Sequence, residues 1–277
     1  MPFTPSHAVV ALPFIRTPLV PAAVAVGAMT PDLPLFVRSP LLGYGRTHDL
    51  AWLPVTTLVA LLLLLLWRCA MRPAARELAP SRLAARLPVE WDRGAAGAAR
   101  DTLGIRAVRE QGRPQRWSVS WRGILILLAS LVIGVVSHIV WDLFTHEGRW
   151  GAAVIPALAE QWGPLEGFKW LQHASSIVGL TILAVWAGLW LRRREAVASV
   201  PRLMPAWLRW AWALSLPVLM AAAWLVGLAV WGPFDGEFTP AHLGYRVLPP
   251  VCGLWGVATL VLALGIQFAR GRTRSRR

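Results

Sequence analysis

Long apolar runs alternate along this chain with polar segments that are rich in arginine. The clearest run, residues 51–67, is dominated by Leu and Val and carries no charged residue. A helix that crosses a bilayer needs about 20 predominantly apolar residues, with a range of about 17–25. Several runs in the sequence reach that length. We therefore predict five membrane-spanning helices, at residues 51–67, 123–144, 175–191, 206–231 and 250–269.

The apolar stretch of residues 4–31 is interrupted by prolines and fits a single straight span poorly. A Thr-Pro pair, which is a helix start signal, begins each half of it, at Thr4 and at Thr17. We predict two helices of about eleven residues, each about 16 Å long, or half a bilayer. Such a re-entrant hairpin returns His7 to the neighbourhood of Asp32, whereas a full span would place them on opposite sides of the membrane.

Composition supports a membrane protein. Of the 277 residues 56% are hydrophobic, 17 are Trp, and the mean hydropathy is +0.52. No basic n-region or A-x-A cleavage site precedes the first span, so we expect no cleaved signal peptide.

The net charge of +14 comes from arginines beside apolar spans, where positive charge sets topology and contacts anionic lipid. We therefore expect membrane lipids as partners and exclude nucleic acid. The two cysteines form no CxxC motif, which argues against a thiolate zinc site.

The positions of the arginines predict the orientation. Residues 68–122 carry twelve Arg against five acidic residues and are predicted to form a partly disordered cytoplasmic loop. Residues 192–194 and the tail at 270–277 are also basic, so the N-terminus lies outside and the C-terminus in the cytoplasm. We expect residues 1–191 to form the domain that carries the site and residues 206–269 to add two accessory helices.

A stripe of potential metal ligands ends the second predicted span. The sequence GVVSHIVWDLFTHEG places His138, Asp142 and His146 at intervals of four residues, on one face of a helix. An ionisable residue in a span costs about 2.5–3.5 kcal/mol on insertion scales, so it is read as functional by default. One alternative is a buried His138–Asp142 pair that only holds two spans together. His146 alternatively orients a carboxylate without binding metal.

Further potential ligands fall at the same, outer end of the predicted spans. With a re-entrant hairpin, these are His7, Asp32, His48 and His173. Asp32 is also a plain turn former in its TPDLP context, and His173 also suits a role as a cap of the third span. The shared face nevertheless favours a common site for these residues.

The spacing of the stripe bears on the number of ions. His138 and His146 are eight residues apart, about 12 Å along a continuous helix, and bonds of about 2 Å cannot join both to one ion. Two ions bridged by Asp142 use both histidines if the helix ends or bends near Thr145. With His and Asp ligands, zinc is the first choice, while manganese and iron stay open.

Four motifs in this order resemble an uncharacterised family of bacterial integral membrane proteins: MPFTPSHAVVALP, GAMTPDLPLF, SHIVWDLFTHEGRW and LQHASS. That family is in turn similar to inner-membrane metal-dependent hydrolases, which have an early His, a Pro-Asp motif, a Thr-His motif and a Ser-His-x3-Asp motif. The resemblance covers roughly residues 1–190 and implies metal-dependent hydrolysis. The matching positions are His7, Asp32, Thr47, His48, Ser137, His138 and Asp142.

The order of the candidate ligands also resembles that of the zinc-dependent phospholipase C and single-strand nuclease group. Two features depart from that group. Ile177 stands where the group has a carboxylate four residues after its last His, and its metal-binding N-terminal amine would here require processing. The resemblance implies hydrolysis of a phosphoester or phospholipid. The implied metal ligands are His7, Asp32, His48, His138, Asp142, His146 and His173.

The sequence predicts an all-α integral membrane protein with a metal site at the outer interface, and the resemblance implies that the membrane is the bacterial inner membrane. The hypothesised activity is hydrolysis of a phosphoester, on a small or lipid-linked substrate, by water whose pKa two ions lower toward about 7. Asp142 and His146 are the catalytic candidates, and Arg46 and Arg149 are candidates for binding phosphate.

Two other functions stay open. One is a non-catalytic membrane protein with a structural metal or polar cluster, and the other is an ion or proton transporter. Transporters place ionisable residues near the midplane of paired or repeated helices, and the sequence shows no repeat. The sequence leaves the oligomeric state open.

Overall fold

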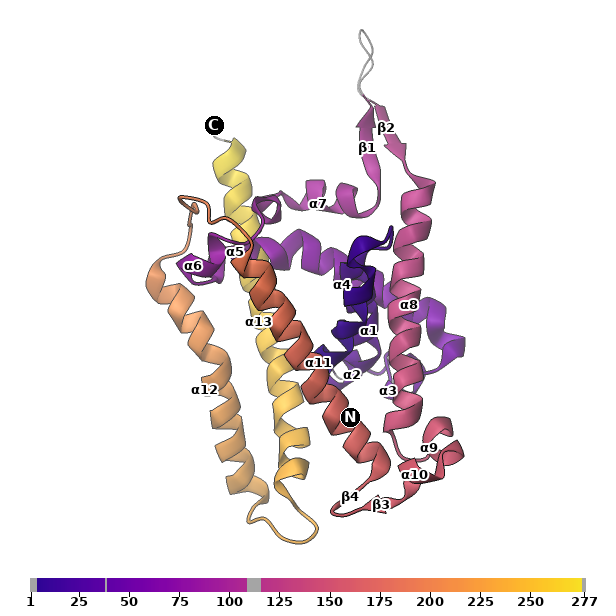
Figure 1. The fold of residues 1–277 in the computed structure, drawn as a ribbon. Helices are drawn as coiled ribbons and strands as arrows, with labels where there is room; N and C mark the ends of the chain where they lie inside the picture. The colour runs from indigo at the N-terminus through magenta and orange to yellow at the C-terminus, as the bar shows by residue number, and fades with distance from the viewer. Residues whose placement is uncertain (1–3, 38, 109–115, 276–277) are drawn as a thin grey trace. The chain divides into compact units, whose positions relative to one another are not determined.

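A computed structural model of the chain describes residues 4–37, 39–108 and 116–275. Helices make up most of this structure, and its strands form two short antiparallel pairs (Figure 1). Within the described residues, five helices are long and apolar enough to cross a membrane: Leu50–Leu78, Trp121–Val154, Gly167–Arg192, Ala206–Trp231 and Pro240–Arg272. The predicted all-α fold with five spans is therefore confirmed.

The chain divides into two compact units. Unit 1 consists of Met1–Leu33, Leu42–Leu65 and Ala99–Arg193, and unit 2 consists of Pro34–Leu41, Leu66–Ala98 and Arg194–Arg277. We expected the segment after the first span to belong with the N-terminal part of the chain. Residues 66–98 instead pack with the C-terminal helices, because Ala74 and Leu78 are buried against Ala263 and Ile266.

The N-terminal hairpin belongs to unit 1. Its first arm is η1, a 3-10 helix over Thr4–Arg16, and its second arm is α1 (Pro21–Met29). The second arm leads into η2, a single 3-10 turn over Thr30–Asp32. The Thr4 hydroxyl donates a hydrogen bond of 2.7 Å to the Asp32 carboxylate, so the two ends of the hairpin meet, as the sequence predicts.

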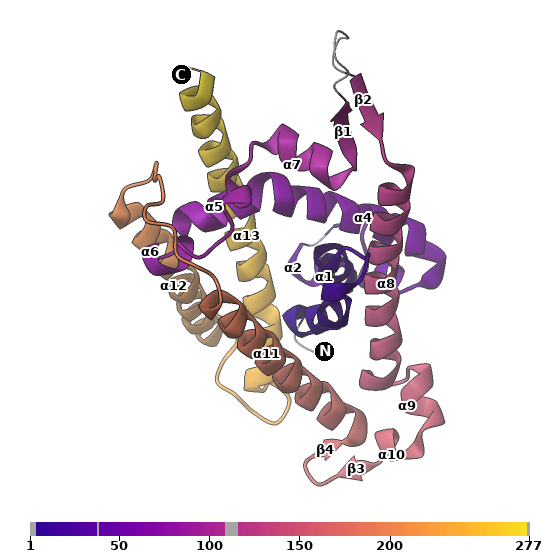
Figure 2. The same ribbon diagram turned by 45° about the horizontal axis from the view of Figure 1, so that its top comes forward.

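The hairpin packs along a long apolar helix of unit 1, α8 (Trp121–Thr145) (Figure 2). At the start of α1, the hydroxyl oxygen of Ser130 on α8 accepts a hydrogen bond of 2.9 Å from the Val20 backbone N–H. Farther along, Gly27 of α1 crosses Gly134 of α8. A Cβ atom at Gly134 would lie 2.2 Å from the Val24 carbonyl oxygen, so this close approach requires glycine.

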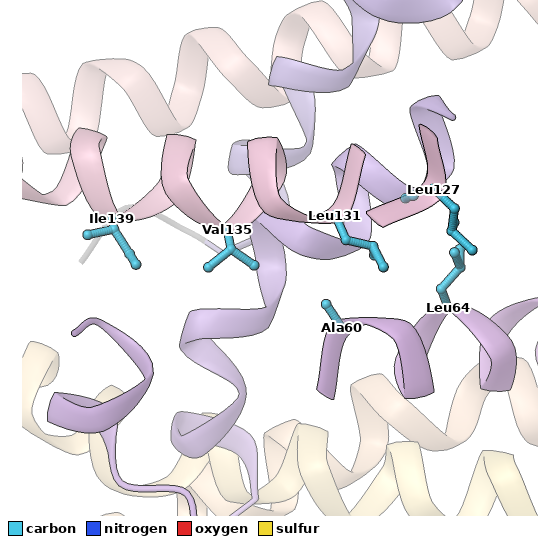
Figure 3. Packing of buried hydrophobic residues seen from close by; sticks show 7 residues of the cluster. Ala60, Leu64, Leu127, Leu131, Val135 and Ile139 are labelled. Carbon is cyan, nitrogen blue, oxygen red and sulfur yellow. The ribbon is translucent and has the colours of Figure 1, made fainter. Parts of the chain in front are cut away.

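The apolar core of unit 1 lies on the same side of α8. Leu127, Leu131, Val135 and Ile139 follow one another at intervals of four residues along this helix (Figure 3). Ala60 and Leu64 of α4 (Leu53–Leu66) and Ala23 of α1 complete the cluster. These contacts hold α1 against α8. They thereby place the end of the hairpin, which leads into Asp32, beside the end of α8 that carries His138 and Asp142.

A second helix, α11 (Gly167–Arg192), covers the first arm of the hairpin. Gly179 of α11 lies against Ser6, whose carbonyl oxygen would be 3.1 Å from an added Cβ. The remaining elements of unit 1 are short: α3 (Tyr44–Thr47), η3 (Leu50–Trp52), β1 (Ile105–Val108), β2 (Arg116–Val119), α9 (Trp150–Val154), α10 (Pro156–Ala159), β3 (Gln161–Trp162) and β4 (Leu165–Glu166). Strand β1 pairs with β2, and β3 pairs with β4.

The basic segment 68–122 is largely folded where the structure describes it, in contrast to the partly disordered loop that we expected. The first predicted span continues past its arginines through a π-helical turn, η4 (Trp67–Met71). Arginine marks where an apolar surface ends, whereas helical hydrogen bonding continues independently of charge. Residues 109–115, which the prediction includes, lie outside the described residues. The segment also contains α5 (Arg72–Leu78), α6 (Ser81–Ala84), η5 (Val89–Asp92) and α7 (Ala95–Thr102).

Unit 2 also contains α2 (Leu33–Phe36, from Pro34 onward), α12 (Ala206–Trp231) and α13 (Pro240–Ser275). Its basic end holds a buried ion network. The carboxylate of Glu77, which is fully buried, accepts hydrogen bonds of 3.0 Å from the backbone N–H groups of Leu203 and Met204. It also pairs with Arg270 at 3.0 Å. A buried carboxylate requires such partners, so this network fixes α5 against the segment before α12.

Candidate metal centre

Four side chains of unit 1 converge on one point. Asp32, His48, His138 and Asp142 are all buried, and one ligand atom of each lies within 4.8 Å of the others. They come from η2, from the residue after α3, and from two successive turns of α8. Among the described residues, this is the group of His, Cys, Asp and Glu side chains that is arranged to hold a metal ion.

The distances between these atoms fit a single ion. A tetrahedral site with bonds of about 2.0–2.1 Å has edges of about 3.3–3.4 Å between its ligand atoms. The Nε2 atoms of His48 and His138 lie 3.2 Å apart. The Oδ2 atom of Asp142 is 3.3 Å from His48 Nε2 and 3.4 Å from His138 Nε2. The Oδ1 atom of Asp32 is 3.8 Å and 3.6 Å from the same two nitrogens.

The histidine tautomers follow from their other ring nitrogens. His138 Nδ1 lies 2.6 Å from the Ala28 carbonyl oxygen, and His48 Nδ1 lies 2.8 Å from the Tyr44 carbonyl oxygen. A carbonyl oxygen only accepts, so each Nδ1 carries a proton, and in its neutral form each ring directs the lone pair of its Nε2 toward the other ring. Two lone pairs at 3.2 Å repel each other unless a cation or a shared proton lies between them. A backbone carbonyl that fixes the tautomer in this way is typical of metal-binding histidines.

The glycine crossing of the fold positions His138. Gly27 precedes Ala28, and a Cβ at Gly27 would lie 2.4 Å from the Leu131 carbonyl oxygen. Because Gly27 and Gly134 let the two backbones touch, the Ala28 carbonyl reaches His138 one turn farther along α8. The crossing therefore connects the packing of α1 to the orientation of one imidazole.

Asp32 is held from the hairpin. The Thr4 hydroxyl donates to its Oδ2 atom, while its Oδ1 atom is buried without a hydrogen-bond partner among the described residues and faces the two histidines. Thr47, the residue before His48, donates a hydrogen bond of 2.7 Å to the Pro31 carbonyl oxygen. Burial raises the pKa of Asp32 above its usual value. A cation beside Oδ1 would favour the ionised form.

Two further histidines flank the group, as the sequence predicts. The ring of His7 stacks on that of His138 with centroids 3.9 Å apart, and His7 Nε2 lies 3.9 Å from Asp142 Oδ1. Burial, followed by the proximity of His138, lowers the pKa of His7 to about 3. Helix α8 ends at Thr145 and His146 has an extended backbone, so its Nδ1 returns to within 3.6 Å of Asp142 Oδ2. In the described structure, His7 Nε2, Asp142 Oδ1 and His146 Nε2 are buried without hydrogen-bond partners.

The predicted phosphate-binding arginines occupy different places. Arg149 lines a small pocket of about 10 Å³ beside His48 and Asp142, which is room for one water-sized group. Arg46 is exposed, and its guanidinium lies over the ring of Trp52, 5.0 Å from the centroid. The structure therefore brings Arg149 to the candidate centre and leaves Arg46 at the surface.

The last predicted ligand, His173, lies on α11 with an exposed side chain. It is outside the group of four, and its neighbour Gln172 is the buried residue of that turn. The structure thus brings together six of the seven predicted ligand residues, four in the tight group and two beside it.

Tyr44 belongs to the site although the sequence analysis did not select it. Its ring packs against that of His48 with centroids 3.9 Å apart, and its hydroxyl donates a hydrogen bond of 3.4 Å to Asp142 Oδ2. Burial is the main reason why the pKa of Tyr44 is raised. The signal that could have revealed it is its spacing of four residues before His48, which places both on one side of a helical turn.

The family comparison covers this site. The model of a family described as "Domain of unknown function (DUF4184)" matches residues 1–264. The chain belongs to this family. No curated protein and no solved structure matches the chain. The expectation of an uncharacterised family is thus confirmed. The match extends beyond residue 190 and includes α12 and most of α13.

The geometry limits the chemistry available to this DUF4184 protein. Two carboxylates and two neutral imidazoles form a donor set with no sulfur, which suits zinc, manganese or iron. Asp142 is central, because its Oδ2 faces the group of four and its Oδ1 faces His7. The described residues therefore fit at least one divalent cation, and three further donor atoms, those of His7, Asp142 and His146, are buried without hydrogen-bond partners.

Proposed function

We propose that this DUF4184 protein is a membrane-bound, metal-dependent hydrolase that acts on a phosphoester. The observation that carries the proposal is the pair of facing Nε2 atoms of His48 and His138. The Nδ1 atom of each ring donates its proton to a backbone carbonyl oxygen, so the Nε2 atoms are available as ligands in the neutral rings. With two carboxylates beside them, this arrangement is electrostatically suited to a divalent cation. Zinc is our first choice, with manganese or iron as alternatives.

We further propose a second ion beside the first. It would bind the donor atoms that the group of four does not use: Asp142 Oδ1, His7 Nε2 and His146 Nε2. Asp142 would then bridge the two ions, one through each carboxylate oxygen. Paired ions about 3.5–4 Å apart are typical of enzymes that hydrolyse phosphoesters. The end of α8 at Thr145, which lets His146 return toward Asp142, supports this arrangement.

The residues around the centre have distinct roles in this proposal. A divalent ion held by Asp32, His48, His138 and Asp142 would lower the pKa of a bound water toward about 7 and so supply a nucleophile at neutral pH. Arg149, in the small pocket beside His48 and Asp142, would bind the phosphoryl oxygens, because a guanidinium matches phosphate in a bidentate manner. Tyr44 would orient Asp142 through its hydroxyl.

The substrate is proposed to be lipid-linked or another small phosphoester that reaches the membrane surface. The ligands cluster at the end of α8 and at the open end of the hairpin, and the distribution of arginines predicts that this end faces outward. The protein is accordingly proposed to lie in the bacterial inner membrane with its N-terminus outside.

A structural metal is the second candidate. The four ligand residues are at most 6% exposed, and the adjoining pocket holds only one water-sized group. Such enclosure is typical of a metal that holds a fold together. A hydrolase requires a further opening at Arg149 when the substrate binds.

The decisive experiment is the metal content of the full-length protein purified in detergent, measured by elemental analysis. The variants are Asp142→Asn and, as a matched control, His173→Ala on α11. Two ions per chain, lost in Asp142→Asn and retained in His173→Ala, support the two-ion centre. One ion per chain supports the structural candidate. A wild-type protein that stays metal-free after zinc and manganese are supplied contradicts the proposal.

Activity is tested next on the metal-loaded protein. A chromogenic phosphodiester and phospholipid vesicles are offered to the wild type and to Asp142→Asn. Turnover by the wild type alone supports hydrolysis. The hydrolase proposal is rejected if the metal-loaded wild type turns over neither substrate, or if Asp142→Asn turns them over equally well.

A further inference from the structure

A second cavity lies in unit 2, none of whose residues contributes to the candidate metal centre. It has a volume of about 100 Å³ and is formed where α5 ends and α12 begins. Its lining combines apolar side chains with Arg209 and Ser81, and the Arg209 guanidinium also donates a hydrogen bond of 2.5 Å to the Met204 carbonyl oxygen. The lining residues are Leu78, Ala79, Pro80, Ser81, Arg209, Trp210 and Ala213.

The cavity is positively charged. Its described lining includes Arg209 and no acidic side chain. Arg202 donates a hydrogen bond of 3.0 Å to the carbonyl oxygen of Ala79 in the cavity wall, and it lies close enough to Arg209 for the two charges to repel each other. The nearby carboxylate of Glu77 is committed to two backbone N–H groups and to Arg270. The cavity therefore favours an anion.

The cavity also lies at one end of a candidate membrane span. Arg209 and Trp210 are in the first two turns of α12, a helix long and apolar enough to cross a membrane. Trp207 and Trp210 are 69% and 61% exposed, respectively. Trp side chains at the end of a span are typical of the headgroup region, where an apolar ring contacts lipid and its N–H reaches water. An occupant from the membrane would bring both an anionic head and an apolar body.

We propose that this cavity binds the phosphate of an anionic phospholipid headgroup, with the acyl chains lying along α12 beyond Ala213. The Arg209 guanidinium would bind the phosphate oxygens, and the Ser81 hydroxyl would donate to them. Basic pockets between spanning helices bind anionic headgroups in this way. Free phosphate shares this chemistry with the lipid but lacks the apolar body that Leu78 and Ala213 would contact.

Native mass spectrometry of the full-length protein in detergent tests the site. The probes are phosphatidylglycerol, phosphatidylcholine and inorganic phosphate. Arg209→Gln removes the charge, and Ala213→Phe fills the cavity from its apolar wall without a change in charge. Arg272→Gln removes the same charge at the basic end of α13 and is the matched control. Thermal unfolding of each variant in detergent confirms that it is folded.

The expected result is saturable binding of phosphatidylglycerol that is weakened about tenfold in Arg209→Gln, the scale of one charge-assisted hydrogen bond. Ala213→Phe is expected to weaken binding as well, while Arg272→Gln binds as the wild type does. The proposal is overturned if Arg272→Gln loses as much binding as Arg209→Gln. It is also overturned if phosphatidylcholine binds equally well, or if millimolar phosphate displaces the lipid completely.

Discussion

His48 and His138 direct the Nε2 atoms of their imidazole rings at each other across 3.2 Å, while the opposite nitrogen of each ring is bound to a backbone carbonyl oxygen. The two rings come from segments 90 residues apart in the sequence. Their facing lone pairs are stabilised by positive charge and destabilised without it. The stability of unit 1 therefore depends on what lies between these atoms.

Metal removal is expected to destabilise the protein. At a free metal concentration about a hundredfold above Kd, the bound ion adds about 2.7 kcal/mol of stability, which corresponds to a shift in Tm of about 5–10 °C. Thermal unfolding in detergent, before and after treatment with a chelator, measures this shift, and added metal should reverse it. The variant His48→Gln is the control, because the chelator should leave its Tm unchanged. Equal shifts in both proteins would show that the chelator acts elsewhere.

Gly134→Ala is expected to disrupt the centre without touching a ligand. The new Cβ would lie 2.2 Å from the Val24 carbonyl oxygen, so α1 must move and carry the Ala28 carbonyl away from His138. Such overpacking costs about 1–3 kcal/mol. Unfolding and metal content are measured together. Gly188→Ala on α11 is the matched control, since a Cβ there has no atom within 4 Å. Retention of full metal content in Gly134→Ala would contradict this role of the crossing.

Thr4→Val tests how the hairpin supports Asp32. The substitution keeps the shape of the side chain and removes the hydroxyl that donates to Asp32 Oδ2 at 2.7 Å. Loss of a hydrogen bond to a ligating carboxylate typically weakens metal binding about 10–100-fold. Competition with a chelator of known affinity measures the change. Thr17→Val, at an exposed hydroxyl that donates to the Phe14 carbonyl oxygen, should bind metal as the wild type does. Unchanged affinity in Thr4→Val would remove Thr4 from the site.

Arg149→Gln separates substrate binding from metal binding. The guanidinium lines the pocket beside Asp142 but is not a metal ligand, so metal content should stay unchanged. In the proposed hydrolase, kcat/KM for a phosphodiester should fall about 10–100-fold, the scale of one charge-assisted hydrogen bond of about 1.5–3 kcal/mol. Arg46→Gln, at the exposed arginine over Trp52, should be neutral. Equal kcat/KM in the two variants would argue against Arg149 as the phosphate ligand.

Much of the site was predictable because the ligands and the helix lengths are local properties of the sequence. The four-residue spacing of His138 and Asp142 fixes their common face of α8, and the short helices before Asp32 require the chain to turn back. Both features depend on helical geometry alone. They account for the shared face of His138 and Asp142 and for the return of Asp32 toward His7.

Other features depend on contacts between distant residues and were not predictable from the pattern. The crossing of Gly27 and Gly134 appears in the sequence as two ordinary glycines in apolar runs. Tyr44 was missed because the four-residue turn that carries it lies in a segment rich in Gly and Pro. The exposed position of His173 depends on the rotation of α11 about its axis, which packing against η1 determines. The folded basic segment likewise depends on the buried partners of Glu77.

Two hydrogen bonds between the second arm of the hairpin and α8, from Val20 to Ser130 and from Ala28 to His138, each join residues 110 positions apart. A ribosome adds about 5–20 residues per second, so this separation corresponds to a delay of about 5–20 s between the two partners. During that time the hairpin exists without its partner helix and without half of its metal ligands. Loading of the proposed metal would therefore be a late event in the biogenesis of this protein, because the group of four is complete only after α8 has been made.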